Sequence, residues 1–167
     1  MKNLLKLTLA VAMMLGAQSL FAQKFGRIDT NAVITAMPEA KEAQTNLEAF
    51  VKDLSDTYET MQVEINNMVA ELQKNEATLS ESMKQLKYKE IQDLSARMEE
   101  YQRSAQQEIQ FKQAELMRPI QEKAMSAINA VAQAGGYTAI FETASLIYFD
   151  PAQMPDIFDA VKVQLGL

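Results

Sequence analysis

Apolar residues recur with helical spacing through residues 39–118, where neither glycine nor proline interrupts the chain. One stripe advances by four and three residues in turn over about four heptads, which predicts a coiled-coil seam. It consists of Leu47, Val51, Leu54, Tyr58, Met61, Ile65, Met68 and Leu72. A second stripe contains Ile91, Leu94, Met98, Tyr101 and Ala105, and after a slip in spacing it continues through Ile109, Leu116, Ile120, Ala127 and Val131. The slip is a stutter, which unwinds a supercoil locally.

A single helix over this whole region would be about 140 Å long, so an antiparallel hairpin of two helices is favoured. Residues 75–82 have the weakest seam, and they carry signals for the start of a helix. Thr78 with Glu81, and Ser82 with Gln85, each fit a capping box. We therefore place the tip of the hairpin at residues 75–82 and the coiled-coil arm at about residues 41–118.

Short strands and helices are predicted on both sides of the arm. Residues 24–29 read as a strand, and residues 30–37 form a short helix capped by Asp29 or Thr30. The return helix passes through Pro119 and ends at the glycines of residues 133–136. Two more strands are predicted at residues 137–142 and 146–149, followed by an amphipathic helix at residues 155–165. The fold is thus mostly α-helical with a small β body, built from residues 23–40 and 119–167.

The strands of this body are too apolar for so small a sheet. Three short strands leave open edges, and open edges pair readily with other strands. Burial against further copies of the same chain is therefore expected. The residues expected in this oligomeric body are Phe25, Ile28, Tyr137, Ile140, Phe141, Ile147 and Tyr148.

The first 22 residues have the pattern of a signal peptide. Lys2 and Lys6 precede an apolar stretch at residues 7–15, which is shorter than the roughly 20 residues that span a bilayer. Cleavage is expected after Ala22, with residues 17–19 as an alternative cut. An uncleaved N-terminal anchor is the competing interpretation, and it is disfavoured because no second apolar stretch follows. Residues 23–167 are then one exported domain.

Composition excludes several kinds of chemistry. The chain has no cysteine and no histidine, so it lacks the thiolate nucleophile and the usual general base and metal ligand. No GxxxxGK phosphate loop occurs, and we expect no cofactor, no metal site and no enzymatic activity. The net charge is −6, and removing Lys2 and Lys6 makes it −8. An acidic chain is unsuited to nonspecific nucleic-acid binding.

The two ends of the chain resemble the OmpH/Skp family of periplasmic outer-membrane-protein chaperones. The pattern falls on Pro119-Ile120, Gly136-Tyr137, Ile140-Phe141, Tyr148, Asp150, Asp156-Ile157, Val161 and Leu165, and on the N-terminal strand at residues 25–29. The arm is similar in composition and period alone. The resemblance implies a homotrimer whose chains share one β-barrel, with arms around a central cavity. It also implies that the protein binds unfolded outer-membrane proteins in the periplasm without ATP and prevents their aggregation.

Four residues are the expected client contacts: Met83, Tyr88, Phe111 and Met117. Methionine and aromatic side chains suit promiscuous apolar binding, and Met83, Phe111 and Met117 lie off the seam. Methionines within the stripe, such as Met61, are interpreted as packing residues.

One departure from the family concerns charge, because well-studied members are basic. The only local basic cluster here is Lys84, Lys87 and Lys89, and Glu81 and Glu90 dilute it. Capture of lipopolysaccharide or anionic membrane is therefore not expected, and neither is stable membrane insertion. The alternative functions are a structural coiled-coil spacer of the cell envelope and an adaptor for a membrane complex.

Overall fold

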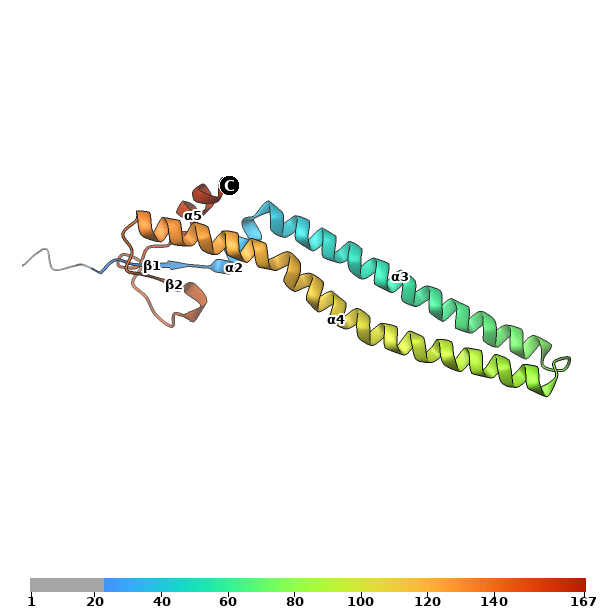
Figure 1. Cartoon of the computed structure of the whole chain (residues 1–167). Coiled ribbons are helices and arrows are strands. Elements are labelled where there is room, and N and C mark those ends of the chain that lie inside the picture. Colours follow the sequence, from blue (N-terminus) through green and yellow to red (C-terminus); the bar gives the residue numbers. More distant parts are fainter. Residues whose placement is uncertain (1–22) are drawn as a thin grey trace, which may run out of the picture. The chain divides into compact units, whose positions relative to one another are not determined.

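The computed structural model describes residues 23–167, and the predicted signal peptide lies outside this part of the chain. The elements follow in the order β1 (Phe25–Ile28), α2 (Thr30–Ala36), α3 (Pro38–Asn75), α4 (Glu81–Ala134), β2 (Ala139–Glu142), a 3₁₀ helix (Thr143–Ser145) and α5 (Phe158–Leu165) (Figure 1). They form two compact units. The hairpin unit comprises residues 34–123, and the sheet unit comprises residues 23–33 and 124–167.

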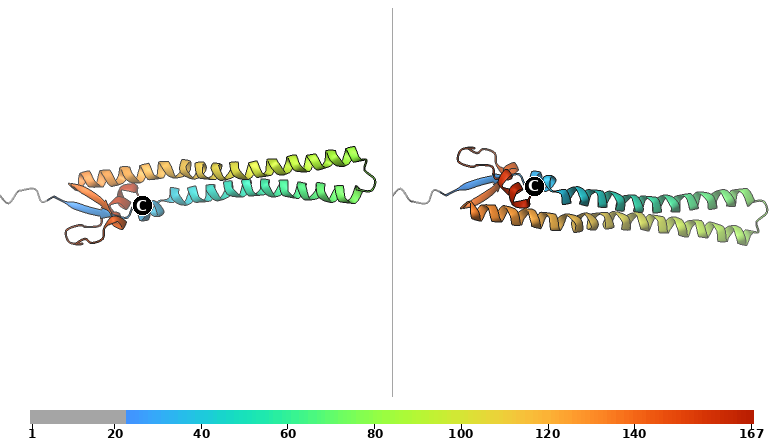
Figure 2. Two further views of the ribbon diagram at one scale, coloured as in Figure 1. Left: turned by 90° about the horizontal axis from the view of Figure 1, so that it is seen from below. Right: turned by 90° about the horizontal axis from the view of Figure 1, so that it is seen from above.

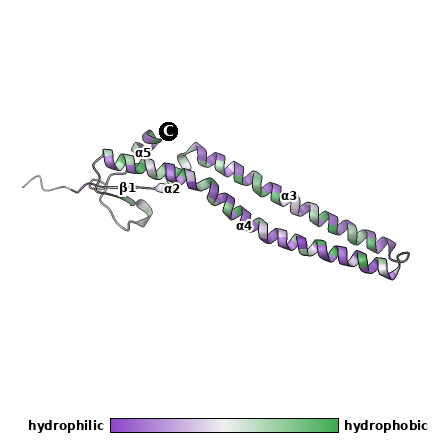
Figure 3. Cartoon of the chain, in the orientation of Figure 1, coloured by the Kyte–Doolittle hydropathy of each residue, from purple (hydrophilic) through white to green (hydrophobic). Residues whose placement is uncertain are grey.

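In the hairpin unit, α3 and α4 run antiparallel and side by side (Figure 2). Apolar and polar residues are interspersed along both helices (Figure 3). Leu72 and Leu94 are buried between them, and the Tyr101 hydroxyl donates a 3.3 Å hydrogen bond to the Leu54 carbonyl on the opposite helix. Lys123 of α4 also donates a hydrogen bond to Glu39, near the start of α3. The predicted antiparallel pair of long helices is confirmed.

The turn at residues 76–80 lies within the predicted tip, but both predicted capping boxes are wrong. Helix α4 begins at Glu81, so Ser82 is already inside it. The Thr78 hydroxyl instead donates to the Asn75 carbonyl at 2.9 Å, which ends α3. Ser80 caps α4, because its hydroxyl accepts the Met83 N–H at 3.4 Å. Several serines and threonines near the turn could cap a helix, and Ser80 does so because it directly precedes the first residue of α4.

In the sheet unit, β1 and β2 form a two-stranded parallel sheet, with Phe25 opposite Ala139 and Ile28 opposite Glu142. Residues 155–157 lie along the other edge of β1. The Arg27 N–H donates a hydrogen bond to the Pro155 carbonyl, and the Ile157 N–H donates one to the Arg27 carbonyl, both at 3.0 Å. Helix α5 therefore begins at Phe158 rather than at the predicted residue 155. The buried core of this unit consists of Ile28, Val33, Ala124, Ala127, Ile128, Ile157 and Val161.

The predicted third strand, residues 146–149, is not formed. The side chains of Ile147 and Tyr148 are almost fully exposed. The Arg27 guanidinium carbon lies over the Phe149 ring, 4.6 Å from the ring centroid. A strand needs a partner for its backbone hydrogen bonds, and within residues 23–167 this segment has none.

Tyr137 is held between two glycines at the junction of α4 and β2. A Cβ atom on Gly26 of β1 would lie 2.9 Å from Tyr137 Cε1, and one on Gly135 would lie 2.5 Å from Cε2. Lys24 places its ammonium 4.1 Å from the ring centroid and donates to the Gly135 carbonyl at 2.7 Å. The next residue, Gly136, has a φ of 65°, which is the predicted left-handed end of α4.

Candidate interaction surfaces

Among residues 23–167, no three Asp, Glu, His or Cys side chains are grouped so that they would hold a metal ion. No helix in that same range is long and apolar enough to cross a membrane. The features of this part of the chain that suit binding are exposed apolar side chains and the shallow cavities beside them.

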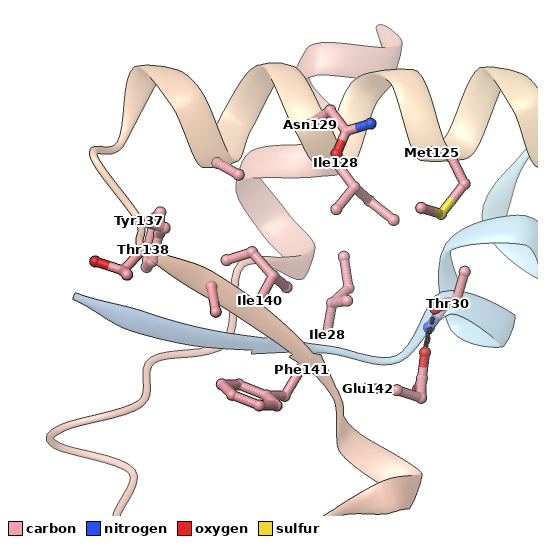
Figure 4. A pocket seen from close by; sticks show the side chains of 12 residues that line it. Ile28, Thr30, Met125, Ile128, Asn129, Tyr137, Thr138, Ile140, Phe141 and Glu142 are labelled. Carbon is pink, nitrogen blue, oxygen red and sulfur yellow. Dashed lines mark hydrogen bonds between the residues drawn. The ribbon is translucent and has the colours of Figure 1, made fainter. Parts of the chain in front are cut away.

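The sheet unit contains a cavity of about 380 Å³ between α4 and the two strands (Figure 4). It is lined by Ile28, Thr30, Met125, Ile128, Asn129, Ala132, Tyr137, Thr138, Ala139, Ile140, Phe141 and Glu142. Its polar end is already satisfied, because the Glu142 carboxylate accepts the N–H of Thr30 at 3.1 Å and the Thr30 hydroxyl. The remaining lining combines apolar side chains with the polar Asn129 and Thr138.

The cavity lies beside an open sheet edge. The Thr138 N–H donates to the Lys24 carbonyl at 2.7 Å, so every second residue of β2 directs its amide toward β1. The intervening residues, Ala139 and Phe141, direct their N–H and C=O groups away from β1. Among the described strands, β2 pairs only with β1. This edge is therefore available to another strand.

The residues predicted for the oligomeric body are only partly brought together. Four of them, Ile28, Tyr137, Ile140 and Phe141, line the cavity. Phe25 contacts Phe141 edge to face, with 6.0 Å between ring centroids. The remaining two are not at the cavity: Ile147 and Tyr148 project from the segment after β2, with relative exposures of 105% and 85%.

Two of the shallow grooves in the hairpin unit lie near the middle of its helices. One, of about 330 Å³, is lined by Phe50, Gln107, Glu108, Phe111 and Lys112. The other, of about 210 Å³, is lined by Val51, Leu54, Ser55, Tyr58, Tyr101, Gln102, Ala105, Gln106 and Ile109. Both lie close to the predicted stutter, where the two stripes are out of step. Reasoning from the sequence missed Phe50, although a large aromatic residue next to a seam position is the signal that identifies it.

The predicted client contacts are spread along α4 rather than gathered into one site. Met83, Tyr88 and Phe111 are exposed. Met117 is half-buried beside Ala43 and Leu47 of α3. Because a helix rises about 1.5 Å per residue, the span from Met83 to Met117 is about 50 Å. Any partner of all four must therefore be long.

Ion pairs neutralise most of the basic cluster near the tip. Lys84 lies 2.9 Å from Glu81, whose hydrogen bond raises the pKa of Lys84. Lys87 lies 3.7 Å from Glu71 and 4.0 Å from Glu90. The tip accordingly offers little uncompensated positive charge to an anionic surface.

Comparison with known proteins gives a consistent result. The model of the family "Outer membrane protein (OmpH-like)" matches residues 24–165. A protein of Aquifex aeolicus (strain VF5), described as uncharacterized, is 27% identical over 130 residues, which are 78% of this chain and 79% of that protein. A crystal structure from Caulobacter crescentus CB15, described as a candidate outer membrane chaperone (OmpH-like), has a TM-score of 0.77 at 14% identity. That match covers 87% of this chain and 85% of the other, and at such low identity it shows a shared fold.

Proposed function

Because the chain belongs to the OmpH-like outer membrane protein family, we propose that it is an ATP-independent holdase of the periplasm. It binds unfolded outer-membrane β-barrel proteins and prevents their aggregation before they reach the membrane. The observation that carries this proposal is the distribution of exposed apolar side chains along the hairpin unit. These are Val51, Val63, Met83, Leu86, Tyr88 and Phe111.

An unfolded barrel protein presents many short segments of alternating apolar residues. Scattered apolar contacts along two long helices match such a client, because many weak contacts together give high avidity. Each contact is weak alone, so the client stays mobile and is released without nucleotide hydrolysis. The OmpH-like description of the Caulobacter crescentus protein as a candidate outer membrane chaperone supports the same function.

We further propose that the sheet unit assembles three chains. The open edge of β2 has a natural partner in residues 146–149, the predicted strand that a single chain does not form. In the assembly, residues 146–149 of one copy pair with β2 of the next and cover the cavity beside it. The almost complete exposure of Ile147 and Tyr148 in the single chain supports this arrangement.

The assembly is tested by native mass measurements on the mature chain. Replacing Ile147 and Tyr148 together by aspartate should convert a trimer to monomers without loss of helix content, because both side chains are already exposed. Val163→Asp is the matched control, since Val163 is 77% exposed on α5. A monomeric wild-type chain, or a double variant that remains trimeric, would contradict the proposed pairing.

The holdase function is tested by diluting a urea-unfolded outer-membrane barrel protein into buffer and following aggregation by light scattering. A few-fold excess of the mature chain should suppress the signal. The triple variant Met83→Ser, Tyr88→Ser, Phe111→Ser should lose most of this effect, whereas Val163→Ser should keep it. Failure of the wild-type chain to suppress aggregation would favour the structural spacer, which binds a folded partner and ignores unfolded chains.

A further inference from the structure

The groove between Phe50 of α3 and Phe111 of α4 is not part of the helix seam. Phe111 is 74% exposed, although burying a phenyl ring is worth about 1.5–3 kcal/mol. Gln107, Glu108 and Lys112 complete a lining of about 330 Å³, which is large enough for one long side chain. An aromatic ring that is exposed to water beside a groove is a surface suited to binding a partner.

The groove lining contains one carboxylate, Glu108, and one ammonium group, Lys112. Lys112 lies 3.1 Å from Glu115 on its own helix, so its charge is locally compensated. Glu108 accepts only the Ser104 hydroxyl, at 3.1 Å, and has no ion-pair partner among the described residues. The groove therefore combines an exposed ring with an uncompensated carboxylate three residues away on the same helix face.

We infer that this groove receives a cationic side chain, lysine or arginine, from an extended apolar segment of an unfolded protein. The inference rests on the proposed holdase function and specifies which segments the arm prefers. A cation above the Phe111 ring gains a cation–π contact, the Glu108 carboxylate supplies the opposite charge, and Phe50 covers the aliphatic stem.

The charge of the whole chain points the same way. It has 22 acidic and 16 basic residues, so long-range attraction draws in cationic segments and repels anionic ones. Phosphate-bearing lipids and nucleic acids are disfavoured on the same ground. An arm of this kind discriminates among unfolded clients by the sign of their charge as well as by their apolar content.

The experiment uses two labelled, unstructured peptides that alternate apolar and polar residues and differ only in carrying lysines or glutamates at the same positions. Fluorescence anisotropy gives the dissociation constant of each for the full mature chain. Wild type should bind the lysine peptide more tightly, and the preference should shrink as salt is raised. Glu108→Gln and Phe111→Leu should each reduce the preference about two- to fivefold.

Glu64→Gln is the matched control, because it removes the same charge from an exposed position of α3 outside the groove. It should leave the preference unchanged. If Glu64→Gln has as large an effect as Glu108→Gln, net charge rather than this groove sets the preference, and the inference is wrong. It is also wrong if Phe111→Leu lowers the native mass, because the occupant is then a second copy of the chain.

The outcome also separates this inference from the function on which it rests. Equal binding of both peptides by wild type would overturn the charge preference and leave the holdase function standing. Failure to bind either peptide would overturn both. Circular dichroism of each variant checks that the hairpin remains helical, which is expected because Glu108 and Phe111 are exposed.

Discussion

Replacing Gly26 by alanine should loosen the packing of β1 against the Tyr137 ring. The added Cβ would lie 2.8 Å from Ile140 Cδ1 and 2.9 Å from Tyr137 Cε1, whereas ordinary contacts are at least 3.4 Å. Ile140 Cδ1 is the end of a flexible side chain and moves aside cheaply. The Tyr137 ring does not, because Gly135 lies against its other edge, where a Cβ would be 2.5 Å from Cε2.

The expected loss of stability follows from two opposing terms. Overpacking a well-filled site costs about 1–3 kcal/mol. Alanine recovers about 0.5–1 kcal/mol relative to a glycine inside a strand, because the unfolded chain loses less conformational freedom on folding. The net destabilisation is therefore about 0–2.5 kcal/mol, and each kcal/mol lowers the melting temperature by about 2–4 °C in a chain of this size.

The assay is thermal unfolding by circular dichroism at one fixed protein concentration, since oligomerisation makes the melting temperature depend on concentration. The double-mutant cycle with Tyr137→Leu isolates the ring. In that background Gly26→Ala should cost less, with a coupling of about 0.5–3 kcal/mol. If Gly26→Ala stabilises the wild type, or costs the same with and without the ring, the reasoning about this contact is refuted.

Three further predictions concern the hairpin and its flanking helix. Leu94→Ala should lower the free energy of unfolding in urea by about 2–5 kcal/mol, because Leu94 is 4% exposed in the seam. The control Leu86→Ala, at a 49% exposed position, should lower it by much less. Equal losses would contradict the assigned seam. Asp29→Ala should cost about 0.5–2 kcal/mol, because the Asp29 carboxylate accepts the Ala32 N–H at 2.9 Å at the start of α2, and Asp29→Asn should recover most of the loss. The hydrogen bond from Lys123 lowers the pKa of Glu39 below its ordinary value of 4.5. The ionised Glu39 therefore stabilises the folded chain above that pH, and this stabilisation is lost as the pH falls through the lowered pKa. Melting temperatures of wild type and Glu39→Gln should therefore differ near neutral pH and converge in acid, and a constant gap would exclude this carboxylate as the cause.

The features that the sequence predicts correctly are those set by local spacing. The 4–3 pattern that includes Leu72 and Leu94 requires two facing helices, and both residues are buried between α3 and α4. The strand at Phe25 and the end of α4 at Gly136 also follow from nearby residues. Such features need no knowledge of distant parts of the chain.

The features that the sequence does not determine depend on distant partners. Residues 146–149 have the pattern of a strand, yet no described strand lies beside them. Residues 155–157 lack such a pattern, yet they pair with β1 through Arg27. Phe50 stands next to a seam position, which is a signal in the sequence, but its groove with Phe111 exists only when α3 and α4 are in register. Of the four candidate client contacts on α4, Met83, Tyr88 and Phe111 are exposed. Met117 is half-buried beside α3, because spacing along one helix does not show which positions the facing helix covers.

The parallel pairing of β1 with β2 gives this fold an uneven contact order. Thr30 and Glu142, which meet beside the sheet, are 112 residues apart, and closing a loop of that length costs about 4 kcal/mol of chain entropy. The helical hairpin forms from contacts that are local at the turn, and it brings Glu39 and Lys123 together at its base. Formation of the hairpin therefore shortens the loop that must still close to bring β1 and β2 together. The N-terminal strand is synthesised first and is expected to find its partner last.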